Sequence, residues 1–81
     1  MDINLGTASN IETSPAQSIT VTNLTVEKWI DYPSESKLYA MITELRREVL
    51  VFEGAEYDAT GDNTGQWTDA EATAKIISIY G

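Results

Sequence analysis

The feature that most constrains the fold of this chain is a helix-start signal near its C-terminal end. Thr68 is followed three residues later by Glu71, the spacing of a capping box, in which each side chain accepts a hydrogen bond from the backbone of the other. This spacing predicts a C-terminal helix from Asp69, with its polar residues confined to one narrow stripe and with Glu71 and Lys75 in the favourable order for an ion pair. The competing interpretation is that the β-branched and aromatic residues at 76–80 end as a strand.

Upstream of this helix, apolar residues alternate with polar ones from Ser18 onward, which is the period of a β-strand. The alternation changes phase after Asn23, so this residue marks a bulge, a bend or a break between two strands. Further strands are expected over 37–45 and 48–52, and a short fourth one around Tyr57. The sequence therefore predicts an α+β fold, a small antiparallel β-meander of three to four strands with one C-terminal helix packed on it.

The expected core combines the apolar side of these strands with one side of the helix. The strand at 48–52 has a continuous apolar run, which suggests burial on both faces. The residues expected to supply most of the core are Ile30, Leu38, Ala40, Ile42, Val49, Val51, Trp67, Ile76, Ile77 and Tyr80.

Residues 1–17 contain small polar residues and only scattered apolar ones, which predicts an extended or disordered N-terminal arm without a core of its own. A sharper interpretation is an arm that becomes ordered along a neighbouring subunit, with Ile3, Leu5 and Ile11 as its anchors. Residues 18–81 then form a single small domain.

A domain of this size favours association with a partner. The 81 residues include no Cys and no His, so disulfides and thiolate or imidazole metal sites are excluded. Small cores usually need such a support or a partner subunit, although domains of about 55–65 residues can fold alone. A homo-oligomer is the favoured expectation.

The charge balance restricts the class of partner. Thirteen acidic residues against five basic ones give a net charge of −8, which disfavours direct binding to nucleic acid or to an anionic membrane surface. No apolar run is long enough to span a bilayer, and residues 1–6 do not resemble a signal peptide. We expect a chain made in a cytoplasm and kept there or in something assembled there.

The sequence gives little support for catalysis or for a cofactor. The segment from Glu53 to Glu71 contains six carboxylates and no Lys or Arg. Such a cluster could hold Ca²⁺, but its spacing does not match an EF-hand loop. A solvated acidic face, or one that meets a basic partner, is the favoured interpretation. Without His or Cys the usual general base and activated nucleophile are missing, and no phosphate-binding loop is present. We therefore expect no enzyme activity, no metal and no cofactor.

Seven aromatic residues are many for a small core, so some of them are candidates for an interface. Trp29 and Tyr39 are the first candidates, because the alternation places them on the strand faces turned away from the expected core; packing within the core is the equal alternative. The helix is apolar around most of its circumference, so a neighbouring chain covering its second side would contact Ile79.

Three segments of the C-terminal half, LVFEG at 50–54, YDATG at 57–61 and QWTDA at 66–70, resemble small virion structural proteins of tailed bacteriophages. The chain departs from their pattern by having Phe52 where Trp is common and by a longer loop at 62–65. The resemblance covers about half of the chain, contains no catalytic motif, and implies a structural component of a phage particle without saying which one.

The sequence therefore predicts a non-enzymatic virion structural protein, a head-decoration, connector or tail-associated subunit assembled in the host cytoplasm and in contact with other virion proteins. The alternative is an acidic mimic of nucleic acid that blocks a basic site on a host enzyme, which the net charge also fits. A mimic should spread its carboxylates over one broad face, whereas a structural subunit needs mixed or apolar contact surfaces.

Overall fold

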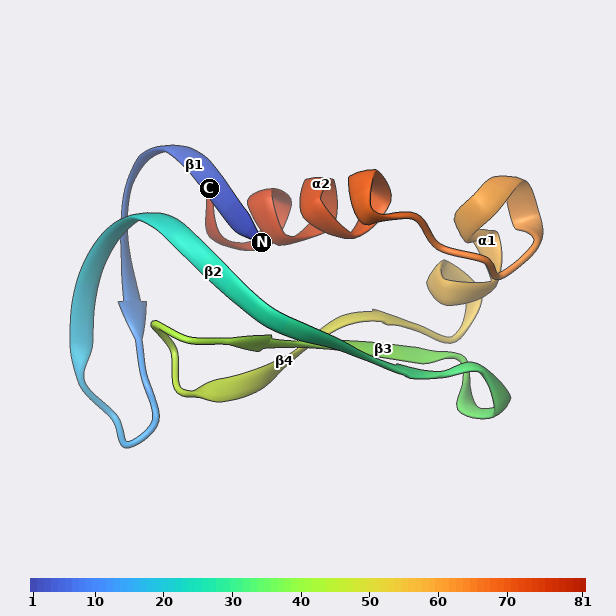
Figure 1. Cartoon of the computed structure of the whole chain (residues 1–81), viewed down its shortest axis with the longest axis horizontal. Helices are drawn as coiled ribbons and strands as arrows, with labels where there is room; N and C mark the ends of the chain where they lie inside the picture. The colour runs from blue at the N-terminus through green and yellow to red at the C-terminus, as the bar shows by residue number, and fades with distance from the viewer.

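The computed structural model describes residues 1–81 and has an α+β architecture in which one antiparallel sheet is covered on one face by helix (Figure 1). The four strands lie in the order β1-β2-β3-β4, so each is paired with its neighbour in the sequence. Two helices follow the sheet, where one was expected. The elements are β1 (Asp2–Glu12), β2 (Ser18–Tyr32), a 3₁₀ turn (Pro33–Glu35), β3 (Lys37–Ile42), β4 (Arg47–Glu53), α1 (Ala55–Asn63) and α2 (Asp69–Tyr80).

The N-terminal segment corrects the expectation of an arm without its own core. Residues 2–12 are extended, but they form strand β1 and pair with β2 of the same chain. Ile3, Leu5 and Ile11 are 1%, 6% and 6% exposed and belong to the same apolar core as the rest of the sheet. The signal was weak in the sequence because five residues without a large apolar side chain separate Leu5 from Ile11. The core of the domain therefore begins at residue 3 and not at residue 18.

Strand β2 is long, curved and shared between two partners. Its first part, up to Thr25, pairs with β1, and its second part, from Val26, pairs with β3. The chain does not break at Asn23. The β1–β2 register shifts next to this residue, between the pairs Asn4 with Asn23 and Ser9 with Val21, so the change of phase marks a bulge within one continuous strand.

Glu44 stabilises the point where β2 changes partner. Its carboxylate accepts hydrogen bonds from the N–H of Thr25 at 2.6 Å and from the hydroxyl of Thr25 at 2.8 Å. Burial raises the pKa of Glu44, but these hydrogen bonds outweigh it and hold the pKa below its ordinary value. The pattern of apolar residues contained no signal for this contact, because it joins a turn to the middle of a distant strand.

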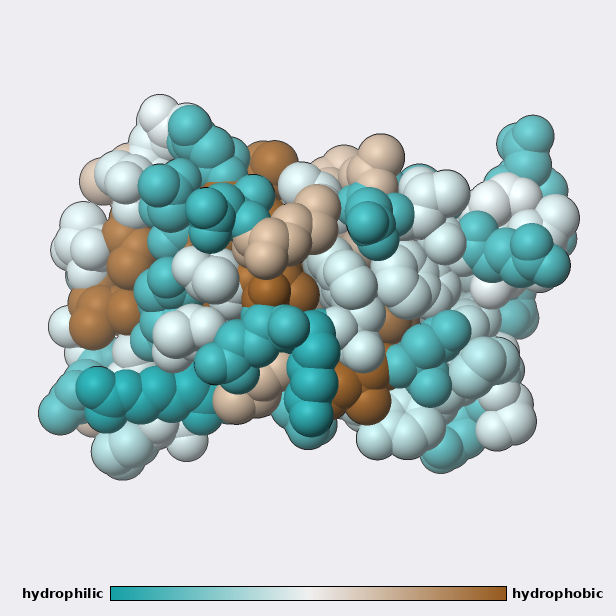
Figure 2. Space-filling model, in the orientation of Figure 1, coloured by the Kyte–Doolittle hydropathy of each residue, from teal (hydrophilic) through white to brown (hydrophobic).

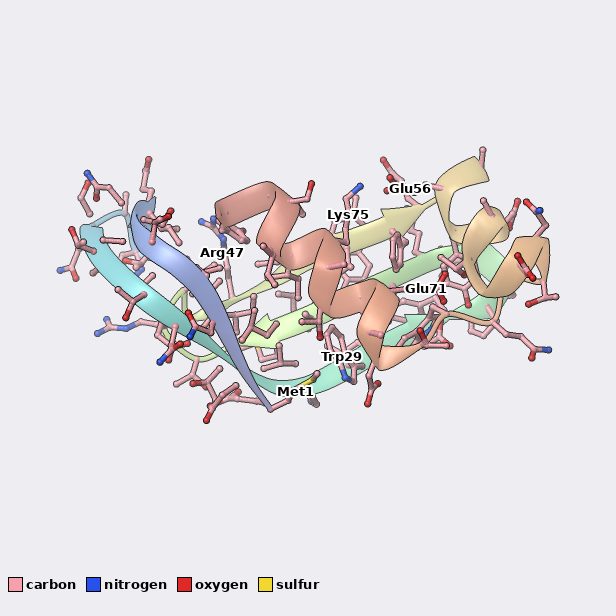
Figure 3. All side chains as sticks on the ribbon, turned by 90° about the horizontal axis from the view of Figure 1, so that it is seen from above. Met1, Trp29, Arg47, Glu56, Glu71 and Lys75 are labelled. Carbon is pink, nitrogen blue, oxygen red and sulfur yellow. The ribbon has the colours of Figure 1, made fainter.

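The helix predicted from Asp69 is confirmed, including its capping box. The hydroxyl of Thr68 accepts from the N–H of Glu71 at 3.2 Å, and the Glu71 carboxylate accepts from the N–H of Thr68 at 3.0 Å. The helix extends to Tyr80, so the alternative of a strand at 76–80 does not hold. The expected ion pair does not form either, because Lys75 pairs with Glu56 of α1 instead (Figure 3).

The short fourth strand expected around Tyr57 is wrong, because residues 55–63 form helix α1 with a kink at residues 60–62. Gly61 is required in this kink: its φ is +60°, and a Cβ there would lie 2.4 Å from the carbonyl oxygen of Gln66. Its N–H donates to the carboxylate of Glu71 at 3.0 Å. One carboxylate therefore caps α2 and ties it to α1.

Most of the expected core is buried. Ile30 is only half-buried, on the face of the sheet opposite α2, and Ile77 is 36% exposed on the solvent side of α2. Trp67 and Tyr80 are partly buried and pack against the core from its edge. The buried members of the expected set are Leu38, Ala40, Ile42, Val49, Val51 and Ile76.

Candidate functional site: the outer sheet face

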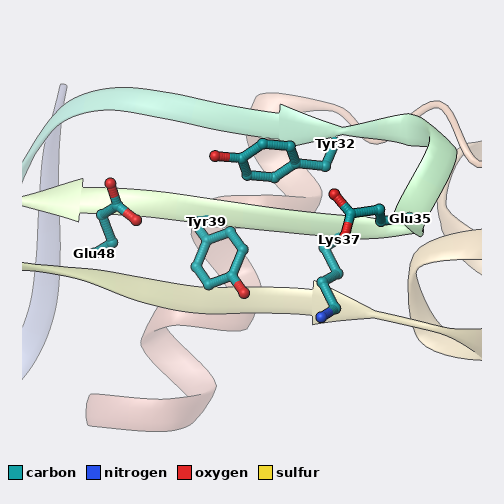
Figure 4. A pocket seen from close by; sticks show the side chains of 5 residues that line it. All are labelled: Tyr32, Glu35, Lys37, Tyr39 and Glu48. Atoms are coloured by element: carbon teal, nitrogen blue, oxygen red, sulfur yellow. The ribbon is translucent and has the colours of Figure 1, made fainter.

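The strands β2, β3 and β4 have one face under α2, the inner face, and one face without a covering element, the outer sheet face. In β3 the residues Leu38, Ala40 and Ile42 are buried on the inner face, and the residues between them are half-buried on the outer one. Figure 4 views the sheet from its outer side, with a helix behind the strands. We define the outer sheet face by Lys28, Ile30 and Tyr32 of β2, Lys37, Tyr39 and Met41 of β3, and Glu48, Leu50 and Glu53 of β4.

The strand register arranges these nine residues in three rows across the sheet. Ile30, Tyr39 and Leu50 are paired neighbours and form an apolar middle row. The row toward the 3₁₀ turn contains Tyr32, Lys37 and Glu53, and the row toward the β3–β4 turn contains Lys28, Met41 and Glu48. The outer sheet face thus has an apolar centre with charged residues toward its margins, which is the general composition of a protein interface.

A shallow hollow of about 360 Å³ lies on this face between the two tyrosines and the charged residues around them (Figure 4). Tyr32 and Tyr39 meet edge to face with ring centroids 5.9 Å apart, and Tyr32 is 41% exposed. The hollow is lined by Tyr32, Glu35, Lys37, Tyr39 and Glu48. Its walls present both apolar ring surface and charged groups to a partner.

On the side of the molecule drawn in Figure 2, the hydrophobic surface is divided. In the view of Figure 2, hydrophobic residues occur in separate patches with hydrophilic ones between them, and one patch lies at the left, over the curved ends of β1 and β2. Ile19 and Val21 of β2 are partly buried and pack against the core. On α2, Ile77 and Ile79 are 36% and 44% exposed.

Apart from Trp29, the residues expected at an interface fall into three groups. Ile3, Leu5 and Ile11 are buried in the core of their own chain and present almost no surface to a partner. Tyr39 lies on the outer sheet face, as expected from its alternation with Leu38 and Ala40. Ile79 is exposed on α2.

Trp29 lies on the inner face, although the alternation places it outside. It pairs with Ala40 of β3, and its ring lies 5.5 Å from the ring of Trp67, centroid to centroid, near the start of α2 (Figure 3). The physical reason is a bulge at Glu27: Val26 pairs with Ile42 while Lys28 pairs with Met41, so one extra residue in β2 reverses the phase. The same bulge turns Ile30 outward.

The acidic segment 53–71 does not gather into one cation site. No three Asp or Glu side chains of the chain converge as metal ligands would. Asp58 accepts from the hydroxyl of Ser36 at 2.8 Å, Glu56 binds Lys75, and Glu71 accepts from the backbone of Gly61 and Thr68. The hydrogen bond from Gly61 lowers the pKa of Glu71, burial opposes this, and the bonds from Thr68 lower it further.

Tyr57 connects α1 to the sheet. Its side chain is 4% exposed, and its hydroxyl donates to the Asp31 carboxylate of β2 at 2.7 Å. Burial, followed by the hydrogen bond and the negative charge of Asp31, raises the pKa of Tyr57 to about 12. The hydroxyl therefore remains a donor throughout the neutral range.

Of the nine residues of this face, sequence reasoning expected only Tyr39 at an interface and missed the other eight, among them Lys28, Ile30, Glu48 and Leu50. Their alternation is visible in the sequence, but their common orientation depends on the two bulges that set the register, at Glu27 in β2 and at Val51 in β4. The bulge at Val51 also allows both Val51 and Phe52 to be buried while Leu50 points outward. The expectation that β4 is buried on both faces is therefore wrong.

No protein-family model, no curated protein and no solved structure matches this chain. The longest helix, α2, has 12 residues, and no helix has the length and apolar character needed to cross a membrane.

Proposed function

We propose that this chain is a non-enzymatic structural protein of a bacteriophage particle, a head-decorating, connector or tail-associated subunit that acts through protein–protein contacts. The observation that carries the proposal is the outer sheet face, where Ile30, Tyr39 and Leu50 lie side by side without a covering element. Contiguous apolar surface with a polar rim is typical of subunit interfaces. Antiparallel sheets commonly leave one face in solvent, so what favours a partner here is the apolar row at the centre of the outer sheet face.

The residues that carry the resemblance to virion proteins support the same class. Tyr57 fixes α1 to the sheet, Gly61 makes the kink, Trp67 packs on Trp29 and Thr68 caps α2. Each of these residues holds the helices on the inner face. The pattern that carries the resemblance therefore fits the architecture of the domain and requires no reaction or ligand.

The distribution of carboxylates disfavours the alternative of a nucleic-acid mimic. Five of the thirteen acidic residues are engaged in hydrogen bonds or an ion pair within the chain, where they stabilise the fold. A mimic needs its charges free and arranged like phosphates on one broad face. The engaged residues are Asp31, Glu44, Glu56, Asp58 and Glu71.

The test is the presence of the chain in purified particles of the virus that encodes it. We expect a fixed number of copies per particle, measured by quantitative mass spectrometry against the major capsid protein after a density gradient. Tyr39→Asp should reduce this number, and Glu12→Lys, at an exposed position of β1, should not; circular dichroism first establishes that both variants are folded. Absence of the chain from washed particles contradicts the proposal, and tight binding of the free protein to a basic host nuclease would then favour the mimic.

A further inference from the structure

The charges of the outer sheet face differ from those of the rest of the chain. On the strands, two lysines, Lys28 and Lys37, balance two glutamates, Glu48 and Glu53, and Glu35 beside the hollow adds one negative charge, so this face carries −1 of the net charge of −8 of the chain. None of the four forms an ion pair within the chain, whose one salt bridge joins Lys75 to Glu56. Most of the negative charge of the chain therefore lies elsewhere, and the outer sheet face is a surface where two copies can approach with little net repulsion.

We propose that the partner of the outer sheet face is a second copy of the same chain, packed face to face about a two-fold axis parallel to β3. This inference rests on the proposed function, because it names the partner that binds the surface on which that function depends. Such an axis places β2 of each copy over β4 of the other. Ile30 then packs on Leu50 of the second copy, Lys28 meets Glu48 of the second copy, and each contact occurs twice, as in any isologous interface.

The strand register selects this axis over the perpendicular one. A two-fold axis across the strands exchanges the two outer rows, so Glu48 would face Glu53 of the second copy and no lysine would face a glutamate. The axis parallel to β3 instead opposes Lys28 to Glu48 and the hydroxyl-bearing Tyr32 to Glu53. Like charges in opposition are destabilising; the perpendicular axis opposes Glu48 to Glu53 twice, and the parallel axis opposes only Lys37 to its own copy, once, so the parallel axis is favoured.

The middle of the interface follows from the same geometry. Tyr39 lies on the axis and meets its own copy, within the apolar row of Ile30 and Leu50. The two Lys37 side chains also meet on the axis, where Glu53, paired with Lys37 on the next strand, and Glu35, which lines the same hollow, supply countercharge from each copy. Face-to-face sheets pack about 10 Å apart with their strands within about 30° of each other, so these opposed side chains are in reach.

Charge reversal provides a matched test. In Lys28→Glu a glutamate faces Glu48 of the second copy twice, and in Glu48→Lys a lysine faces Lys28 twice, so each single variant should raise the dimer dissociation constant about 30-fold or more. An equimolar mixture of the two variants forms a heterodimer in which both contacts are again opposite in charge. The double variant Lys28→Glu/Glu48→Lys restores both contacts in a homodimer.

Sedimentation equilibrium of the full chain measures the outcome. We expect the parent protein to dimerise, each single variant to dissociate, and both the mixture and the double variant to recover. Glu12→Lys changes the net charge as Glu48→Lys does but lies away from the face, so it should dimerise like the parent. A monomeric parent protein, single variants that remain dimeric, or a mixture that fails to recover would overturn the inference.

The competing location for a dimer is the exposed side of α2. Ile77→Glu places a charge there, and dissociation of the dimer by this variant, with Lys28→Glu still dimeric, would assign the interface to α2 and reject the outer sheet face. The inference and the proposed function fail separately. A chain that is monomeric but present in particles rejects the second copy as partner, whereas a dimer absent from particles rejects the structural role and leaves the dimer intact.

Discussion

Replacing Ile3 by Ala tests whether the N-terminal segment belongs to the core. Ile3 is 1% exposed and pairs with Leu24, which is fully buried, in the part of the sheet where β1 contacts α2. Truncation of a fully buried Ile removes its apolar contacts and leaves a cavity, which typically costs 2–5 kcal/mol, and we expect about 3 kcal/mol here. With a slope near 1 kcal/mol per molar urea for a domain of this size, the midpoint of unfolding should fall by about 3 M.

Ile79→Ala is the matched control, because it makes the same chemical change at a residue that is 44% exposed. Its cost should stay below about 1 kcal/mol, since little apolar area is lost and Ala has a higher helix propensity than Ile. Both variants are compared with the parent protein by urea unfolding at one protein concentration, because association would add to the apparent stability. Equal midpoints for the two variants would refute the reasoning and return residues 1–17 to an arm outside the core.

Three further predictions concern contacts that hold the layers together. Tyr57→Phe should destabilise the protein by about 1–2 kcal/mol at pH 7, because it removes the hydrogen bond to Asp31. The pKa of Tyr57 is raised to about 12 from an ordinary value of 10, so this contribution is present below pH 10 and is lost as the pH rises through the folded pKa. The unfolding free energies of parent and variant should therefore converge between pH 10 and 12. Glu44→Gln should reduce the loss of stability in acid. The lowered pKa of Glu44 stabilises the fold at pH values above 4.5, the ordinary pKa of this group, and this contribution is lost as the pH falls through the folded pKa. Thr25→Val, which removes one hydrogen-bond donor to Glu44, should have a smaller effect of the same sign, and urea melts at pH 3–6 measure both. A double-mutant cycle of Trp29→Ala and Trp67→Ala should give a coupling of about 0.5–1.5 kcal/mol in the unfolding free energy, and a coupling near zero would mean that the two rings do not stabilise each other.

The sequence predicted the elements whose signals are local. The capping box fixed the start of α2, and the alternation of apolar residues located most of β2, β3 and β4. These signals are contained within a few residues, so they do not depend on which strands become neighbours. The same reason explains why the buried set around Leu38, Ala40 and Ile42 could be predicted.

Two elements could not be predicted because their structure depends on distant residues. β1 has few apolar residues, and its strand structure comes from pairing with β2 and packing against α2. α1 contains a kink at Gly61 and one buried aromatic residue, Tyr57, whose position is set by Asp31 on β2. A short pattern of this kind is ambiguous between helix and strand until its partner is known.

The outer sheet face is a product of the two bulges, and this explains why the candidate site escaped the sequence pattern. If Glu27 were an ordinary paired residue of β2 and not a bulge, simple alternation from Val26 would turn Lys28 and Ile30 into the core and Trp29 outward. A buried lysine would lack a partner there, which is costly, whereas the bulge keeps Lys28 in solvent and gives Trp29 its contact with Trp67, just before α2. The bulge that stabilises the inner face therefore also places Ile30 beside Tyr39 on the outer one. The apolar row is thus coupled to the stability of the core, and a protein that retains such a row in solvent-facing positions without a covering helix is suited to bury it against a partner.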